Sequence, residues 1–166
     1  MTVMSCEEVR EAIGARRFVD WRGLPPGCTA EELFGVPLDD SWGALPLGNA
    51  REQARSRLLE LPGYYRPLAY ARDGVVVAFD AMNPQLDGDA RSLAESLGPP
   101  DATLDWTFGT VSMPGGEQVY AGRGITLSNN PETQGVVYVT VYAPTTLETY
   151  LKRLRPPREK RPLPRP

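Results

Sequence analysis

The sequence predicts one α+β domain, an antiparallel sheet meander with a few short helices packed on one face. Three observations lead to this fold class. The chain has 166 residues, the length of one ordinary domain. Its hydrophobic fraction of 41% suits a packed core. Helix-capping motifs and strand-like runs occur along the chain, with Gly, Pro and Asn between them. We expect a single domain over residues 1–154.

The first element is predicted to be a helix with its own capping motif. Ser5 and Glu8 form an S-x-x-E capping box, in which each side chain accepts a hydrogen bond from the other residue's backbone amide. Apolar residues then recur at helical spacing, and Gly14 is expected to end the helix. Residues 18–19 follow as a possible short strand.

A second capping box opens the next helix. Thr29 and Glu32 have the same spacing, and the helix is expected to run through Phe34 and to stop at Gly35. Residues 38–61 remain open between helix, strand and loop. Apolar residues in their second half fit helical spacing and strand alternation equally well.

Clearer signals follow in the middle of the chain. Residues 68–71 and 75–79 flank Asp73-Gly74, a dipeptide typical of a two-residue hairpin turn. Residues 90–97 present one apolar stripe and precede Gly98, which favours a helix with a glycine cap. The chain then predicts a meander of strands linked by turn-rich segments. The expected strands are 103–111, 117–120, 124–128 and 136–142, and residues 113–116 and 129–131 are expected turns.

The last helix is predicted from a third capping box. Thr145 and Glu148 provide it, and the apolar stripe extends to Leu154. Beyond this helix, residues 155–166 are rich in proline and basic side chains. We expect them to form a flexible tail.

The distribution of charge argues against nucleic acid as a partner. The net charge is −3, but residues 152–166 hold seven basic side chains and one acid. Residues 1–151 therefore carry a net charge of −9. An acidic body repels phosphate backbones, so a nucleic-acid role would depend on the tail alone.

Cysteine usage and hydropathy predict a cytoplasmic protein with no membrane association. Cys6 and Cys28 are too few for the disulfide framework of a small secreted domain and are expected to be unreactive thiols. No apolar run approaches the length of a membrane span, and the first ten residues do not resemble a signal peptide. Arginine far outnumbers lysine, and this composition is typical of a GC-rich bacterial genome.

Two segments carry a resemblance to a known family. Residues 27–37 read GCTAEELFGVP, and residues 89–100 include a helix ending in Leu97-Gly98-Pro99-Pro100. Together they resemble the signature of the SmpA/OmlA-type lipoproteins and of the beta-lactamase-inhibitor-protein-like fold. The similar stretches cover under a third of the chain. The resemblance implies short helices against an antiparallel sheet and a role in binding other proteins.

The residue types present leave few routes to catalysis. The chain contains no histidine, which excludes Ser-His-Asp and Cys-His machinery and histidine-bearing metal sites. The run from Asn83 fails as a calcium loop, because its twelfth position is Ala94. We expect no catalytic residue, no metal and no cofactor, although acid–base work by carboxylates stays open.

Tyr and Trp side chains are the candidate partner-binding residues, because they are the usual anchors of protein interfaces. On strand 136–142 tyrosines alternate with valines, so they face outwards or into a helix if the valines face the core. The other aromatic candidates lie in turn-rich segments. The candidate residues are Tyr138, Tyr142, Trp21, Trp42, Tyr64 and Tyr65, with Arg158, Lys160 and Arg161 from the tail.

These features predict a non-catalytic protein-binding module, of the kind that serves as an immunity or inhibitor protein against a basic toxin or enzyme. Its partner would be another protein. One alternative is an assembly component that docks through its basic, proline-rich tail. Another is a small carboxylate-dependent enzyme. The sequence leaves the partner's identity and the oligomeric state open.

Overall fold

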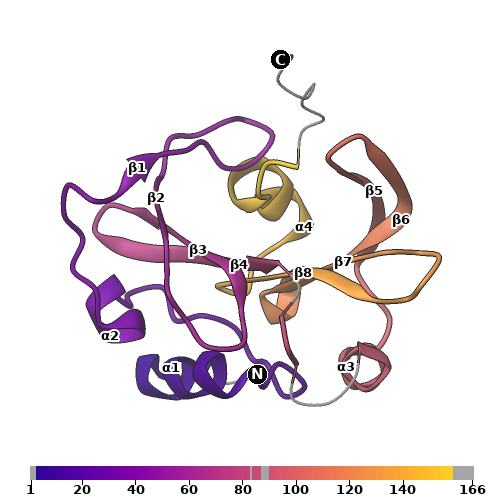
Figure 1. Ribbon diagram of the computed structural model, residues 1–166, viewed down its shortest axis with the longest axis horizontal. Coiled ribbons are helices and arrows are strands. Elements are labelled where there is room, and N and C mark those ends of the chain that lie inside the picture. The colour runs from indigo at the N-terminus through magenta and orange to yellow at the C-terminus, as the bar shows by residue number, and fades with distance from the viewer. Residues whose placement is uncertain (1–2, 83, 87–89, 159–166) are drawn as a thin grey trace.

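An eight-stranded antiparallel sheet organises the chain (Figure 1). The computed structural model describes residues 3–82, 84–86 and 90–158. The strand order is β1-β2-β3-β4-β8-β7-β6-β5, so the two halves of the chain meet at the β4–β8 pair. The strands are β1 (Gly43–Ala44), β2 (Arg55–Leu58), β3 (Tyr65–Arg72), β4 (Val75–Met82), β5 (Ala102–Phe108), β6 (Val111–Tyr120), β7 (Ile125–Asn129) and β8 (Val136–Tyr142).

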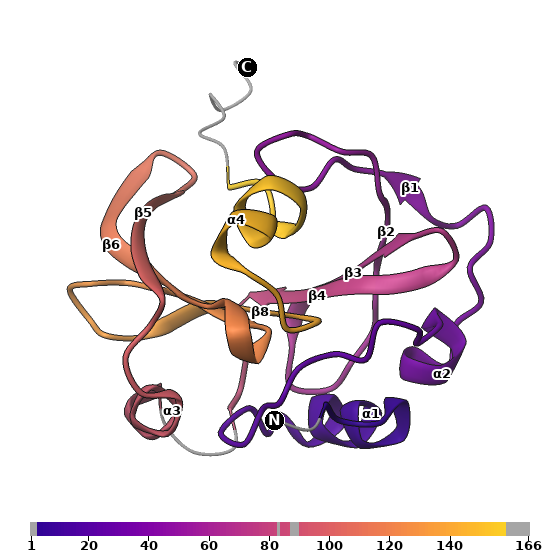
Figure 2. The same cartoon turned by 180° about the vertical axis from the view of Figure 1, so that it is seen from behind.

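Helices cover both faces of this sheet (Figures 1 and 2). On one face lie α1 (Cys6–Ala15), α2 (Ala30–Phe34) and α3 (Ala90–Leu97). On the other lie α4 (Leu147–Thr149) and the π-helical turn η2 that continues it (Tyr150–Leu154), between the β1–β2 and β5–β6 ends of the sheet. A short 3-10 turn, η1 (Ala121–Arg123), joins β6 to β7. The α+β class is confirmed, and α4 adds a second covered face.

Strand β8 explains why the sheet has two cores. Val139 and Val141 are fully buried against the α1 side, in the larger apolar cluster. On the opposite side Tyr142 is also fully buried and stacks on Tyr150, with ring centroids 4.9 Å apart. We call the side occupied by Tyr142 and Tyr150 the α4 face.

The capping motifs near the N-terminus behave as the sequence predicts. Ser5 with Glu8 and Thr29 with Glu32 both make reciprocal capping boxes. Helix α2 ends at Gly35 as expected. Helix α1, however, continues past Gly14 and ends with Arg16 in the left-handed region at φ 58°.

At the last helix the expected capping pair is wrong by one position. Thr146, not Thr145, caps α4, and its hydroxyl accepts a hydrogen bond from the Thr149 amide. The amide of Thr145 instead binds the carbonyl of Ala121. This contact holds Thr145 in the connection from the sheet, so that the helix begins one residue later.

The β3–β4 hairpin is confirmed, with both turn residues at positive φ, 52° at Asp73 and 82° at Gly74. Residues 55–58, which the sequence left open, form β2 against β3. The short strand expected at residues 18–19 is absent. Phe18 is instead buried in the core, 5.9 Å from Trp21 between ring centroids.

The turns expected around the β5–β6 hairpin are misplaced. The chain turns at residues 109–110, inside the strand expected at 103–111, and the expected turn at 113–116 lies within β6. Gly115 has a φ of 66°, and its amide donates to the Asp105 carboxylate 2.8 Å away. Gly and Pro here allow an irregular strand beside the Trp106 ring; they do not form a turn.

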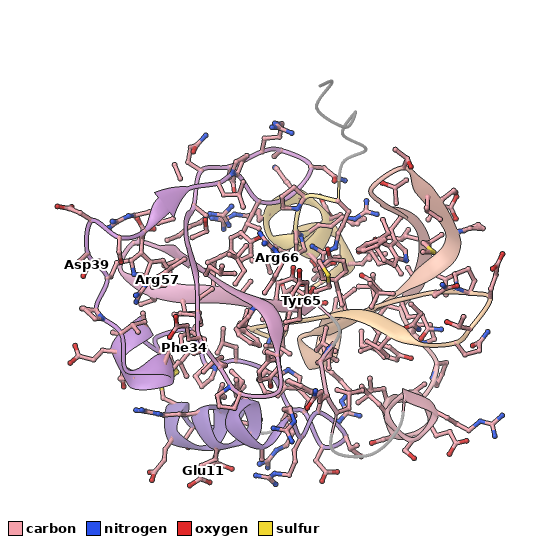
Figure 3. All side chains as sticks on the ribbon, viewed as in Figure 1. Glu11, Phe34, Asp39, Arg57, Tyr65 and Arg66 are labelled. Carbon is pink, nitrogen blue, oxygen red and sulfur yellow. A yellow bond between two sulfur atoms is a disulfide. The ribbon has the colours of Figure 1, made fainter. Side chains whose placement is uncertain are left out.

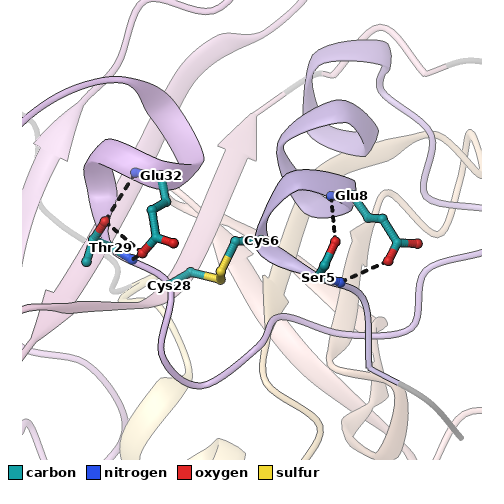
Figure 4. Close-up of a disulfide and its surroundings, with 6 residues drawn as sticks. All are labelled: Ser5, Cys6, Glu8, Cys28, Thr29 and Glu32. Atoms are coloured by element: carbon teal, nitrogen blue, oxygen red, sulfur yellow. Dashed lines mark hydrogen bonds between the residues drawn. A yellow bond between two sulfur atoms is a disulfide. The ribbon is translucent and has the colours of Figure 1, made fainter.

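The expectation of two free thiols is wrong, because Cys6 and Cys28 form a disulfide (Figure 4). Cys6 is the first residue of α1, and Cys28 directly precedes the cap of α2. Their Cα atoms lie 5.7 Å apart. The tertiary packing of the two helix starts creates this pair, and a separation of 22 residues in sequence could not reveal it.

The first part of the expected tail is packed against the domain. The Arg155 carbonyl accepts a hydrogen bond from the Gly48 amide, and the Arg158 carbonyl accepts one from the Thr107 hydroxyl. Residues 159–166 lie outside the described part. Residues 155–158 therefore pack on the domain, which extends four residues beyond the expected boundary at residue 154. Among the described helices, none is long and apolar enough to cross a membrane.

Candidate protein-binding surface

The open end of the α4 face carries a row of large side chains contributed by three strands. Tyr65 of β3 pairs with Met82 of β4, which pairs with Tyr138 of β8. Residues directly opposite one another on neighbouring strands project from the same face of a sheet. Tyr65 and Tyr138 therefore share the α4 face, and Figure 3 shows Tyr65 beside Arg66 below α4.

Exposed apolar side chains concentrate at this end. Of the five large hydrophobic side chains that are exposed among the described residues, all but Val3 belong to it. Leu58 is 51% exposed and reaches the same face through the cross-strand row Leu58–Leu68–Asp80. Tyr65 is 58% exposed. The other two, Phe108 and Val111, are a cross-strand pair at the tip of the β5–β6 hairpin.

Aromatic contacts connect the β5–β6 hairpin to Tyr138 of β8. Phe108 and Trp106 lie 6.3 Å and 5.8 Å from the Tyr138 ring, measured between centroids. We define the apolar surface as Leu58, Tyr65, Phe108, Val111 and the half-buried Tyr138, with the buried Trp106 beneath it. Isolated exposed apolar residues are ordinary, but a grouped set of this size is typical of an interaction site.

The backbone beside Tyr65 is irregular. The β3–β4 register shifts between Tyr65 and Leu68, and Arg66 lies in the left-handed region at φ 51°. A non-glycine residue in this region costs roughly 1 kcal/mol or more, and such positions cluster at functional sites. The shift sets the direction of the Tyr65 side chain relative to the regular part of β3.

A buried ion pair lies next to the apolar surface. Arg158 donates from Nη1 to Asp80 Oδ2 at 2.8 Å and from Nη2 to Asp80 Oδ1 at 2.7 Å. Thr140 donates its hydroxyl to Asp80 Oδ1 at 2.6 Å. The guanidinium carbon stands 3.5 Å from the centroid of the Tyr138 ring. Burial disfavours the charged guanidinium, but the Asp80 carboxylate outweighs it and raises the pKa of Arg158 above its ordinary value.

A second buried carboxylate lies deeper under η2. Glu117 binds the Arg155 guanidinium through Oε1 and accepts a hydrogen bond from the Tyr150 hydroxyl at 2.7 Å through Oε2. Burial, reinforced by the neighbouring Glu117 charge, raises the pKa of Tyr150 well above its ordinary value. Each of the two buried carboxylates is thus matched with an arginine from residues 155–158.

An open cavity of about 390 Å³ is lined by this segment and by the β5–β6 hairpin. Arg155 and Arg158 line one side, Trp106 and Thr107 another, and the loop around Asn49 a third. The cavity therefore gives solvent a path to the edge of the Asp80–Arg158 pair. In the described part of the chain, no three acidic or cysteine side chains are grouped closely enough to hold a metal ion.

Three of the aromatic partner-binding candidates are buried. Tyr142 is under η2, Trp21 donates its indole N–H to the Gly124 carbonyl, and Trp42 donates to the Pro37 carbonyl. Trp21 and Trp42 lie in turn-rich segments that fold back over the core, where a backbone carbonyl satisfies each indole N–H. Tyr142 on β8 faces into a helix, one of the two orientations that the sequence left open.

The remaining candidates divide into three groups. Tyr64 is partly buried, and its hydroxyl donates to the Ile13 carbonyl. Tyr65 is exposed, and Tyr138 is half-buried beneath Arg158. Lys160 and Arg161 lie outside the described residues. Sequence reasoning missed Leu58, Phe108 and Val111, since their grouping depends on the strand register, and it considered Asp80 only as one of several carboxylates open to acid–base work.

Comparison of the chain with protein-family models, with characterised proteins and with solved structures finds no match. Relatives therefore add nothing to the resemblance noted in the sequence.

Proposed function

We propose that this protein is a non-catalytic protein-binding module and that its partner docks on the apolar surface. The observation that carries the proposal is the grouping of Leu58, Tyr65, Phe108 and Val111 at one end of the α4 face. Aromatic residues are enriched in the cores of protein interfaces, where a few of them supply most of the binding free energy. Tyr65, with 58% of its surface available, is the expected anchor.

The charge of the chain supports a basic partner. Residues 1–158, which include the packed start of the tail, carry a net charge of −5, and a long-range negative field speeds the approach of a positively charged protein. An inhibitor or immunity protein that caps a basic toxin or enzyme combines such a field with an apolar anchor. This combination suits the chain better than carboxylate catalysis does, since Asp80 and Glu117 are both engaged by arginines.

The disulfide bears on where this binding takes place. The expectation of a cytoplasmic location followed from the lack of a membrane span and of a signal peptide and treated the two cysteines as thiols, whereas Cys6 and Cys28 are bonded. Disulfides persist in oxidising compartments and are rare in the cytosol of most organisms. The bond therefore supports function in an oxidising compartment.

A pull-down from the lysate and the exported fraction of the source cells tests the docking surface. The tagged wild-type chain is compared with Tyr65→Ser and Phe108→Ser, and Val3→Ser is the matched control because Val3 and Phe108 are both 39% exposed. We expect one stoichiometric partner that binds the wild type and the control. Tyr65→Ser should weaken its binding by about 2 kcal/mol, roughly thirtyfold.

Folding of every variant is checked by circular dichroism before binding is measured. Equal retention of the partner by all four chains would place the interface elsewhere and contradict the proposal. Loss of binding in the Val3→Ser control alone would do the same, because it would move the interface to the N-terminus.

A further inference from the structure

The surroundings of Asp80 have the features of a pocket that recognises a guanidinium group. Asp80 is 4% exposed, and Thr140, which donates to it, is 1% exposed. The carboxylate receives two parallel N–H donors from Arg158, and the Tyr138 ring lies against the guanidinium plane. The planar guanidinium of arginine can donate two hydrogen bonds to one carboxylate and stack on an aromatic ring at the same time. The compact ammonium of lysine does not make the paired hydrogen bonds or the planar stacking.

Arg158 is satisfied in this pocket at its terminal nitrogens but not at its Nε. Both terminal nitrogens of Arg158 bind Asp80, yet its Nε is buried without a hydrogen-bond partner among the described residues. A buried, unsatisfied donor opposes binding. An arginine that enters from another direction keeps the carboxylate fork while leaving its own Nε accessible to a partner.

The route of exchange is open in the structure. The Arg158 side chain retains 14% exposure and borders the 390 Å³ cavity beside β5 and β6. Its backbone is held by the hydrogen bond from Thr107, and Pro156 and Pro157 before it have no amide hydrogen to donate. A competing guanidinium replaces the two hydrogen bonds to Asp80 and the stacking on Tyr138, so the hydrogen bond from Thr107 is the further contact that must break for Arg158 to leave.

We infer that Asp80, Thr140 and Tyr138 form an arginine-binding pocket, filled by Arg158 in the free protein and by an arginine side chain of the bound protein in the complex. The identity of the carrier rests on the proposed function, because the pocket adjoins the apolar surface through Tyr138 and Trp106. The affinity for guanidinium does not rest on it and can be measured without a partner. Arg158 thus keeps Asp80 compensated until a competing arginine replaces it.

Chemical rescue of the full-length Arg158→Ala chain tests this pocket. The melting temperature is measured against increasing N-ethylguanidinium, with N-ethylammonium at the same concentrations as the charge-matched control. We expect a saturable rise of several degrees with the guanidinium alone, because a ligand that binds only the native state raises its stability by mass action. Blocked Gly-Arg-Gly peptide should reproduce the rise, and blocked Gly-Lys-Gly should not.

Two further chains give the specificity of the effect. The double variant Asp80→Asn/Arg158→Ala lacks the carboxylate, so its melting temperature should not rise with N-ethylguanidinium. The melting temperature of the wild type should also stay unchanged at concentrations that saturate Arg158→Ala. If Arg158→Ala does not fold alone, recovery of its near-ultraviolet circular dichroism in N-ethylguanidinium, and not in N-ethylammonium, is the equivalent result. No recovery, an equal response to both cations, or an equal response of the double variant overturns the pocket.

These outcomes are distinguishable from a failure of the proposed function. If guanidinium rescues Arg158→Ala and Tyr65→Ser still retains the partner, the arginine-binding pocket is supported and the docking surface is contradicted. If the partner depends on Tyr65 and guanidinium gives no rescue, the docking surface is supported and the pocket is contradicted.

Discussion

Arg158 binds the Asp80 carboxylate through both terminal nitrogens, at 2.7 and 2.8 Å, across 78 residues of sequence. The pair joins the C-terminal segment to the central strand of the α4 face. It lies between the covered part of that face, under η2, and the apolar surface.

Removal of Arg158 should destabilise the fold. Arg158→Ala leaves the buried Asp80 carboxylate without its counter-charge, so we expect the free energy of unfolding to fall by about 3 to 5 kcal/mol. Urea unfolding followed by circular dichroism measures the change. The matched control is Arg153→Ala, which breaks an ion pair to Glu52 whose side chains are 52% and 40% exposed. It should cost under about 1 kcal/mol. Equal losses would show that burial of the Asp80 pair contributes nothing.

Reduction of the disulfide should lower stability while leaving the sheet intact. The bond closes the loop between α1 and α2, and cross-links of this span contribute about 3 kcal/mol. We expect the melting temperature to fall in dithiothreitol. The Cys6→Ser/Cys28→Ser chain should melt at that lower temperature with or without the reductant. A wild-type melting temperature that is the same with and without dithiothreitol would show that the bond adds no stability.

Alkaline pH should unfold the protein through its buried tyrosines. Burial raises the pKa of Tyr142 and of Tyr150 above their ordinary value. The stability linked to their protonated hydroxyls is fully present below about pH 10. It is lost at higher pH, since the unfolded chain ionises tyrosines that the native state keeps protonated.

Each such tyrosine should lower the free energy of unfolding by about 1.4 kcal/mol per pH unit above pH 10. Urea titrations between about pH 9 and about pH 11 measure the slope, and the tyrosinate absorbance of the buried tyrosines should appear together with unfolding. Tyr150→Phe removes one of the groups and should give a shallower slope. An unchanged slope would contradict the assignment.

Gly116 should not tolerate a side chain. A Cβ at this position would stand 2.4 Å from the Asn129 carbonyl oxygen and 2.6 Å from the Trp106 indole nitrogen. We expect Gly116→Ala to cost about 1 to 3 kcal/mol in unfolding free energy, as overpacking does. Gly122→Ala is the control, because its Cβ would meet nothing within 4 Å. A Gly116→Ala chain as stable as the control would refute the close approach of Trp106.

Local chemistry explains the elements that the sequence predicted correctly. Capping at Ser5 and Thr29 depends on side chains three residues away, and the hairpin at Asp73-Gly74 depends on two residues at positive φ. Similar local signals failed at residues 113–116. There Gly115 serves an irregular strand, because the Asp105 side chain ten residues earlier accepts its amide. A contact of that kind is invisible to any short window of sequence.

The candidate site was predicted only in part, for the same reason. Tyr65 and Tyr138 were identified as aromatic candidates, and the structure places them on one face. Leu58 was missed because its segment fits helix and strand spacing equally well. Asp80 was considered among the carboxylates, but its arginine partner 78 residues away could not be seen in the sequence. Trp21 and Tyr142 are buried. The sequence left the orientation of Tyr142 open, since residue type does not tell which face of a two-sided sheet a helix will cover.

The sequence by itself determined the fold class, the starts of α1 and α2, the β3–β4 turn and the α3 helix. These depend on side-chain to backbone contacts within a few residues and on the spacing of apolar side chains. Tertiary structure alone decided the Cys6–Cys28 bond, the coverage of both sheet faces and the Asp80–Arg158 pair. Each of these joins groups at least 22 residues apart. Their proximity follows from strand register and helix docking, where burial of the whole apolar surface outweighs local preference.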